Sequence, residues 1–246
     1  MEASARPINV GYSERRLITR SFFDEELQEE YSTILGPVQN GCGIKGGISI
    51  TTFGVSTMLD AKPEFGAIQG DIKNGFNEVK RESIMGAMRL APGLANTLVF
   101  SHMLLNPKTY VGMGSGTNLV TAPFRSEEGS QQGSIEGGWF FALAANAAFQ
   151  KLNKTLVEAG GAATAIMDDN YAMGPPSVIF PANDQLKVDL AAVGLELQPS
   201  KSCCYIDAAH RTDEWDRLRG DIPEGVLRNG AEVIRVNGEP LRGMSV

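Results

Sequence analysis

Residues 165–171 read Ala165-Ile166-Met167-Asp168-Asp169-Asn170-Tyr171, an apolar run that is interrupted by two acidic residues and then ends in a tyrosine. The pattern predicts a β-hairpin with the doublet Asp168-Asp169 at its tip. A second run, Ala67-Ile68-Gln69-Gly70-Asp71, predicts a strand that ends in a third carboxylate. Carboxylates at adjacent strand ends can hold two Mg²⁺ ions about 3.5–4 Å apart, which aligns an attacking hydroxyl with a leaving oxygen.

The acidic doublet has a second interpretation, because Asp is common in exposed surface turns. The doublet alone does not separate a metal site from such a turn. Four segments that follow one another along the chain favour the metal site. They are Asp71-Ile72-Lys73-Asn74-Gly75-Phe76, Glu128-Gly129-Ser130-Gln131-Gln132-Gly133-Ser134, Met167-Asp168-Asp169 and Gly194-Leu195-Glu196-Leu197-Gln198-Pro199-Ser200-Lys201.

This succession resembles the palm motifs A, B, C and D of reverse transcriptases, particularly those of retrotransposons. Near the start, Arg6-Pro7-Ile8 with Arg15-Arg16-Leu17 is similar to the second fingers motif of that family. Near the end, residues 233–241 are similar to the segment that follows the palm. The resemblance covers nearly the whole chain. It implies an RNA-directed DNA polymerase of a retroelement, which uses an RNA template and a DNA primer and adds deoxynucleotides to the primer 3′-hydroxyl.

The resemblance also implies roles for the acidic and basic residues. Asp71 and Asp168 would bridge two Mg²⁺ ions, for which Mn²⁺ can substitute, and Asp169 would lie further out. Lys201 would protonate the leaving pyrophosphate, since an ammonium there supplies a proton and offsets negative charge. Arg6 would clamp the triphosphate, because a planar guanidinium suits bidentate phosphate contact. In an unrelated protein, a lysine at position 201 would be solvated and idle.

Three further residues would contact the substrates. Phe76 stands five residues after Asp71, where a ring under the nucleotide sugar leaves no room for a 2′-hydroxyl. The alternative for Phe76 is a core residue at a helix start. Gln132 and Gly133 precede a long apolar helix and would pack against the templating base and the incoming nucleotide, although Gln-Gly is also common in ordinary loops. Glu136 follows this turn, and a carboxylate near a polyanion is unexpected.

Two other functions stay open. An RNA-dependent RNA polymerase shares the palm, but usually has an Asp where Phe76 stands and a Gly where Met167 stands. A decayed or repurposed element would keep the fold as a nucleic-acid-binding module without turnover. Ile166, which replaces an aromatic residue, Glu136 and the absence of an upstream fingers motif favour that alternative.

Composition indicates a globular protein in a reducing compartment. The chain has 246 residues, 42% of them hydrophobic, and a net charge of −7. Proteins that grip nucleic acid usually carry a basic footprint, so we expect weak and salt-sensitive binding. Three cysteines and two histidines form no disulfide framework or zinc pattern, which predicts the cytoplasm or nucleus. No apolar run is long enough to cross a bilayer, which predicts no membrane association. The first third of the chain holds a basic group: Arg6, Arg15, Arg16, Arg20, Lys45, Lys73, Lys80 and Arg81.

The predicted fold class is α+β: a right-hand palm, with a split β-α-β antiparallel sheet backed by helices, and partial, mostly helical fingers. Residues 1–60 would form the partial fingers and their connection to the palm, 61–220 the palm, and 221–246 the start of a thumb connection. Helices are expected from Ser13 to about Leu35 and from about Asn77 to Leu90, followed by a looser region to Pro107-Lys108. The glycine-rich loop 41–47 is interpreted as a hinge before a helix that carries Ile48, Thr51, Val55 and Met58.

Overall fold

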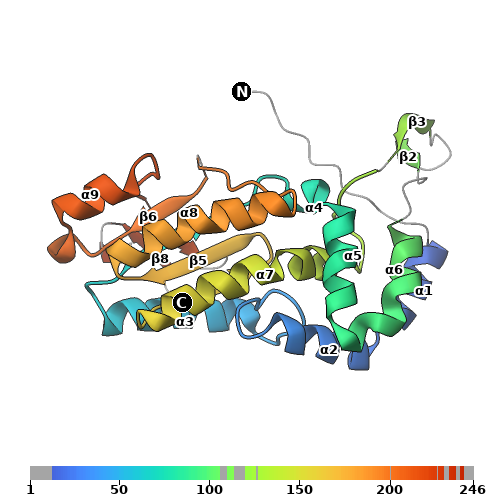
Figure 1. Cartoon of the computed structure of the whole chain (residues 1–246), viewed down its shortest axis with the longest axis horizontal. Helices are drawn as coiled ribbons and strands as arrows, with labels where there is room; N and C mark the ends of the chain where they lie inside the picture. The colour runs from blue at the N-terminus through green and yellow to red at the C-terminus, as the bar shows by residue number, and fades with distance from the viewer. Residues whose placement is uncertain are drawn as a thin grey trace.

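The computed structural model describes residues 13–105, 110–113, 120–125, 127–199, 201–225, 227–229, 233–236 and 239–240. A four-stranded antiparallel sheet lies at one end of the molecule and a group of helices at the other (Figure 1). The sheet contains β1 (Gly66–Gly70), β4 (Ala162–Ile166), β5 (Asp169–Gly174) and β6 (Cys203–Tyr205), in the order β4-β5-β1-β6.

Two helices make the connections within the sheet. Helix α7 (Gly137–Glu158) precedes β4, and α8 (Pro176–Ala192) connects β5 to β6. The palm part therefore runs β1, α7, β4, β5, α8, β6, which is the split β-α-β layout. This confirms the predicted fold class. Gly194 ends α8 with a φ of +86°, as its place after the apolar stripe of the helix predicts.

Alternating residues along each strand cover the two faces of the sheet. Ile68, Ala172 and Cys204 belong to the main core with α7 and α8. Their neighbours in sequence pack with α3 (Gly47–Ala61) in a second core. Burial of each large apolar side chain contributes about 1.5–3 kcal/mol, so both layers hold the sheet in place. The second core consists of Val55, Leu59, Phe65, Ala67, Tyr171, Met173 and Tyr205.

The first helical segment is two helices, and the prediction of one helix from Ser13 to Leu35 is wrong. α1 (Ser13–Phe22) ends before Asp24, and α2 (Glu25–Leu35) begins after it. The Leu27 amide donates to Asp24 Oδ1 at 3.0 Å. A carboxylate that accepts a hydrogen bond from the N3 amide is a strong helix start signal. This bond starts a new helix at Glu25, although the apolar pattern had suggested one continuous helix.

The segment after β1 also differs from its prediction. The helix expected from Asn77 to Leu90 is divided into α4 (Gly75–Glu78) and α5 (Arg81–Leu90). At the break, the Lys80 amide donates to the Val193 carbonyl at 3.0 Å instead of to its own helix. The expected loose region after Leu90 is instead helical, with η1 (Pro92–Thr97) and α6 (Leu98–Leu104).

Helix α3 follows the glycine-rich loop as predicted, and Thr51 and Val55 are buried. Ile48 was expected on the same face, but its side chain is 46% exposed. Position 48 lies in the first turn of α3, and the buried face of the helix is formed by Gly47, Thr51, Val55 and Leu59. No helix within the described ranges is long and apolar enough to cross a membrane.

The remaining elements lie outside the four-stranded sheet. They are β2 (Tyr110–Met113), β3 (Val120–Arg125), η3 (Ala208–His210), α9 (Asp213–Arg219), β7 (Leu227–Asn229), β8 (Val233–Val236) and β9 (Glu239–Pro240). Strands β2 and β3 precede α7 in the chain, and the others follow β6.

Candidate active site

The hairpin that carries the acidic doublet turns one residue earlier than predicted. Ile166 pairs with Asp169, so the two-residue turn is Met167-Asp168, and Asp169 is the first residue of β5. Met167 has a φ of +56°, a left-handed conformation that costs a residue with a side chain roughly 1–2 kcal/mol. Such conformations persist where the surrounding structure enforces them. Asp168 thus occupies a tight and strained turn.

The strand pairing brings the other two carboxylates next to this turn. Gly70 lies opposite Asn170 in the β1–β5 pair, so Asp71 follows one partner and Asp169 precedes the other. The buried Asn170 side chain donates to the Gly70 carbonyl at 3.0 Å. A β-carbon at Gly70 would lie 2.8 Å from the same amide, so only glycine fits. Asn170 and Gly70 fix the spacing of the acidic strand ends.

The Asp71 carboxylate is partly enclosed, with 16% of the side chain exposed. Its Oδ2 is buried and has no hydrogen-bond partner among the described residues. Lys201 Nζ is 3.8 Å from this oxygen, which is within ion-pair range but too long for a hydrogen bond. A buried carboxylate oxygen without a donor is costly unless a cation lies near it. Lys201 is one such cation, and a carboxylate oxygen is also the type of ligand that Mg²⁺ prefers.

The ligand set is not complete from the protein alone. Within the described ranges, no three His, Cys, Asp or Glu side chains come together as a group that could hold a metal ion. Mg²⁺ commonly takes one or two carboxylates and completes its shell with water and substrate phosphates. Asp71 with the neighbouring Asp168 could meet that need, whereas a preformed set of three carboxylates is not present in the described part of the chain. The metal assignment stays a prediction.

Lys201 reaches Asp71 because the segment before it runs alongside the end of β1. The Gln198 amide donates to the Asp71 carbonyl at 2.7 Å, and the Lys73 amide donates to the Glu196 carbonyl at 2.8 Å. The Asp71 amide donates to Ser202 Oγ at 3.4 Å. These backbone contacts hold the two segments together, while the Lys201 side chain is 48% exposed and free to adjust.

Phe76, Gln132 and Gly133 line one pocket of about 310 Å³. The sequence placed them in two separate motifs, and the fold brings them to one cavity together with Met167 of the hairpin turn. The Phe76 ring also stacks on Phe141 of α7, with centroids 4.9 Å apart. The ring therefore packs against the core, as the alternative interpretation expected, and the contact with a nucleotide sugar stays a prediction for a residue that lines the cavity.

The glycine-rich loop forms another wall of this pocket. Gly41, Cys42 and Gly43 line the cavity, so the prediction of a plain hinge missed a contact with the site. A β-carbon at Gly41 would lie 2.8 Å from the Met167 amide nitrogen. Burial raises the pKa of the Cys42 thiol to about 12, so this wall is neutral near pH 7. The local sequence does not show that this loop lines the site, because Met167, which it contacts, lies more than 100 residues away.

The loop that carries Gln132 is anchored from behind by a buried arginine. Arg81 donates to the carbonyls of Glu128, Gly129 and Leu105 at 3.0–3.1 Å. Burial lowers the pKa of Arg81, and the charge of Glu128 opposes that shift. The Ser130 amide donates to the Phe76 carbonyl at 2.6 Å, which ties the loop to α4. Arg81 was expected in a basic surface group, but its guanidinium is a structural anchor.

The Glu136 carboxylate, which was unexpected near a polyanion, has a cation as its partner. Its Oε1 accepts from Arg15 of α1 at 2.8 Å, and only 4% of the glutamate side chain is exposed. Arg15 also donates to the Leu104 carbonyl at 3.2 Å. The pair links α1 to the start of α7 and neutralises the Glu136 carboxylate. It explains Glu136 and takes Arg15 out of the predicted basic group.

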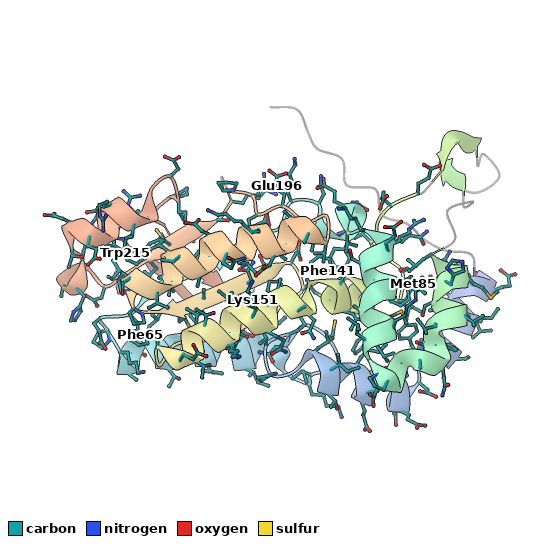
Figure 2. The ribbon with its side chains drawn as sticks, in the orientation of Figure 1. Phe65, Met85, Phe141, Lys151, Glu196 and Trp215 are labelled. Atoms are coloured by element: carbon teal, nitrogen blue, oxygen red, sulfur yellow. The ribbon has the colours of Figure 1, made fainter. Side chains whose placement is uncertain are left out.

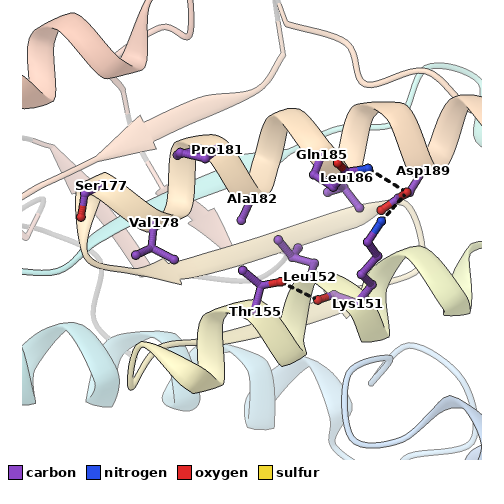
Figure 3. Close-up of a pocket in the computed structure, with 10 residues that line it drawn as sticks. All are labelled: Lys151, Leu152, Thr155, Ser177, Val178, Pro181, Ala182, Gln185, Leu186 and Asp189. Carbon is purple, nitrogen blue, oxygen red and sulfur yellow. Dashed lines mark hydrogen bonds and ion pairs between the residues drawn. The ribbon is translucent and has the colours of Figure 1, made fainter.

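A second pocket, also of about 310 Å³, lies between α7 and α8 (Figure 3). The ion pair between Lys151 and Asp189, at 2.9 Å, spans it. None of the sequence-predicted site residues that the structure describes lines this pocket. The pocket beside Met167 is the candidate active site, because it adjoins the acidic strand ends.

The structure brings together most of the predicted site. Strand register places Asp71, Asp168 and Asp169 at one end of the sheet, Lys201 Nζ lies 3.8 Å from Asp71, and Phe76, Gln132 and Gly133 line the adjoining pocket. Arg6 lies outside the described residues. Figure 2 shows the two ends of the sheet, with Phe141 and Glu196 toward the site and Trp215 and Phe65 toward the opposite end.

Comparison with solved structures identifies the type of fold. The chain is similar to apo telomerase from Candida tropicalis truncated from the C-terminal domain, with a TM-score of 0.54 and 12% identity over 76% of this chain and 40% of that chain. The fold is a polymerase palm with fingers. Apo telomerase from the same organism gives a TM-score of 0.52 and 14% identity over 67% of this chain and 32% of that chain.

Telomerase from Candida albicans, solved in complex with a TWJ fragment of telomeric RNA, gives a TM-score of 0.51 and 11% identity over 88% of this chain and 37% of that chain. The chain thus spans about 32–40% of the length of these telomerases. No protein-family model matches the chain, and no curated protein matches it in sequence. At these identities the likeness shows the fold alone.

Proposed function

We propose that the chain is the palm and partial fingers of a retroelement reverse transcriptase, an RNA-directed DNA polymerase. The observation that carries the proposal is the buried Asp71 Oδ2, which has no hydrogen-bond partner among the described residues and lies beside the turn that holds Asp168. The similar Candida albicans enzyme was solved with a fragment of telomeric RNA, which supports RNA binding here. The DNA primer and the deoxynucleotide substrates follow from the same proposal.

The proposed reaction joins the primer 3′-oxygen to the α-phosphorus of a deoxynucleoside triphosphate, and the bond to the β-phosphate oxygen breaks. Asp71 and Asp168 would hold two Mg²⁺ ions, with Asp169 assisting. When bound, such ions supply charge neutralisation and alignment. The hydroxyl proton passes to solvent, and Lys201 donates a proton to the leaving pyrophosphate. Little covalent chemistry is required of the protein, because positioning and electrostatics carry phosphoryl transfer.

The pocket beside the carboxylates would take the incoming nucleotide. Phe76 would exclude a 2′-hydroxyl, and its stacking on Phe141 holds the ring in place for that role. Gln132 and Gly133 would lie against the base pair, on a loop that Arg81 fixes from behind. Arg6, outside the described residues, would contact the triphosphate.

The test is Mg²⁺-dependent extension of a DNA primer on an RNA template. We expect extension by the wild type and a loss of activity of more than about 100-fold in Asp168→Asn. Removal of a group that only hydrogen-bonds to a metal ligand already costs about 10- to 100-fold in activity. Asp189→Asn is the matched control, because Asp189 pairs with Lys151 at the pocket between α7 and α8. Equal loss in both variants would contradict the assignment.

A catalytically decayed nucleic-acid-binding module is the second candidate, and the net charge of −7 favours it. It predicts no incorporation by the wild type with primer–template binding intact. An RNA-dependent RNA polymerase would instead incorporate ribonucleotides in preference to deoxynucleotides. The same assay therefore separates the three functions.

A further inference from the structure

The Met167-Asp168 turn is held by a side chain that lies far away in the sequence. Gln39 is 2% exposed. Its Oε1 accepts from the Met167 amide at 2.8 Å, and its Nε2 donates to the Met167 carbonyl at 3.2 Å. One side-chain amide therefore binds both polar backbone groups of the residue that has the left-handed conformation. The two partners, one a donor and one an acceptor, also fix the orientation of the Gln39 amide.

Gln39 is itself held rigidly against the hairpin. The Ala165 amide donates to the Val38 carbonyl and the Asn40 amide donates to the Ala165 carbonyl, both at 2.8 Å. Gln39 thus forms a parallel bridge with Ala165, at the free edge of β4. The Asn40 side chain donates to Thr164 Oγ1 at 2.9 Å and to Thr51 Oγ1 at 3.0 Å, which ties the same segment to β4 and α3.

Residues 39–42 make further close contacts with one another and with the turn. The Gly41 amide donates to Gln39 Oε1 at 2.9 Å, so this oxygen accepts two hydrogen bonds. Cys42 Sγ lies 3.6 Å from Met167 Sδ. The turn is therefore enclosed by residues 39–42 on the side of the pocket, and a change in the Gln39 amide leaves two backbone amides without their acceptor.

We propose that Gln39 is a positioning residue for the Asp168 carboxylate. It holds the backbone of Met167 in the left-handed conformation, and that conformation sets the direction in which the next residue projects. Gln39 does not take part in the chemistry. The proposal rests on the proposed function, in which Asp168 binds the metal ions.

The first test measures Mn²⁺ affinity of the full chain by electron paramagnetic resonance in Gln39→Leu, which keeps the side-chain size and removes the amide. We expect affinity to fall about 10- to 100-fold, as for other groups that orient a metal ligand, with unchanged primer–template affinity. Gln150→Leu is the matched control. The Gln150 amide also donates to two backbone carbonyls, Leu35 at 3.2 Å and Gly36 at 2.8 Å, at the start of the segment that carries Gln39, and it makes no hydrogen bond to Met167.

The second test is a rescue. Glycine adopts the left-handed conformation without steric cost, so Met167→Gly should restore most of the Mn²⁺ affinity in the Gln39→Leu background. A role confined to general stability would not be relieved in this way. Met167→Gly alone provides the reference, because its side chain lines the pocket.

The outcomes separate the two proposals. If Asp168→Asn binds Mn²⁺ as tightly as the wild type, the metal site itself is wrong and the positioning role falls with it. Suppose that Asp168→Asn weakens Mn²⁺ binding. If the Mn²⁺ affinity of Gln39→Leu then equals that of the wild type, or equals that of the control Gln150→Leu, the positioning role alone is overturned. Failure of Met167→Gly to restore affinity would also overturn it.

Discussion

The two ends of the four-stranded sheet are built from different kinds of contact. At the end that holds Gly70 and Met167, buried amides of Asn170 and Gln39 bind backbone groups, and a carboxylate oxygen of Asp71 has no donor among the described residues. At the opposite end the buried contacts are mainly apolar, although Trp215 Nε1 is also buried without a hydrogen-bond partner among the described residues, and Arg211 and Arg219 form ion pairs there. The first end contains the left-handed backbone of Met167, whereas the second contains the buried ring of Trp215, which stabilises the fold.

The apolar end is organised around Trp215 of α9. Its side chain is fully buried and meets Phe180 edge-on, with ring centroids 4.9 Å apart. Gly66 leaves room for the indole, since a side chain there would overlap the ring. At the other end, the side-chain amides of Gln39 and Asn170 are fixed by hydrogen bonds to the backbone. Natural proteins depart from ideal packing at functional sites, which agrees with the function proposed for the Asp71 end.

The largest effect on stability is expected at the apolar end. Trp215→Ala should lower the free energy of unfolding by about 3–5 kcal/mol, because it removes a buried aromatic ring and leaves a cavity. Urea denaturation measures the change. Gly66→Ala tests the same contact from the strand side and should also destabilise. Extension activity per folded molecule should stay at the wild-type level in both variants, and a selective loss of activity would break the contrast between the two ends.

A smaller effect, on selectivity, is expected at the polar end. Phe76→Val should lower the preference for deoxynucleotides over ribonucleotides by roughly 10- to 200-fold, the range for small changes of shape in a substrate pocket. Single-nucleotide incorporation with each substrate measures it. Phe141→Leu removes the stacking partner without changing a residue that lines the pocket, and should lower the preference less than Phe76→Val does. If Phe76→Val prefers deoxynucleotides as strongly as the wild type does, Phe76 does not exclude the 2′-hydroxyl.

The sequence predicted the elements that depend on local pattern. The strand before Asp71, the hairpin at residues 165–171 and the helix that ends at Gly194 follow from periodicity and turn residues. The break at Asp24 was missed, although its capping side chain was visible in the sequence. Here a local hydrogen bond outweighed an apolar stripe that continued across it.

Long-range partners could not be predicted from the sequence. Gln39 lies 128 residues from Met167, and Arg15 lies 121 residues from Glu136. No periodicity connects such positions, and a buried glutamine has the same local signature as an exposed one. The carboxylates were identified from a resemblance to motifs, whereas the amides that hold them became visible only in the folded chain.

The central claim is that Asp71 and Asp168 together hold a pair of divalent cations. The most direct measurement is a crystal structure of the chain with primer–template, a non-reactive deoxynucleotide analogue and Mn²⁺, with the metal located by anomalous scattering. The account predicts two peaks about 3.5–4 Å apart, both in contact with Asp71 and Asp168. Peaks elsewhere, or a bound nucleotide whose phosphates lie away from Asp71, would contradict it.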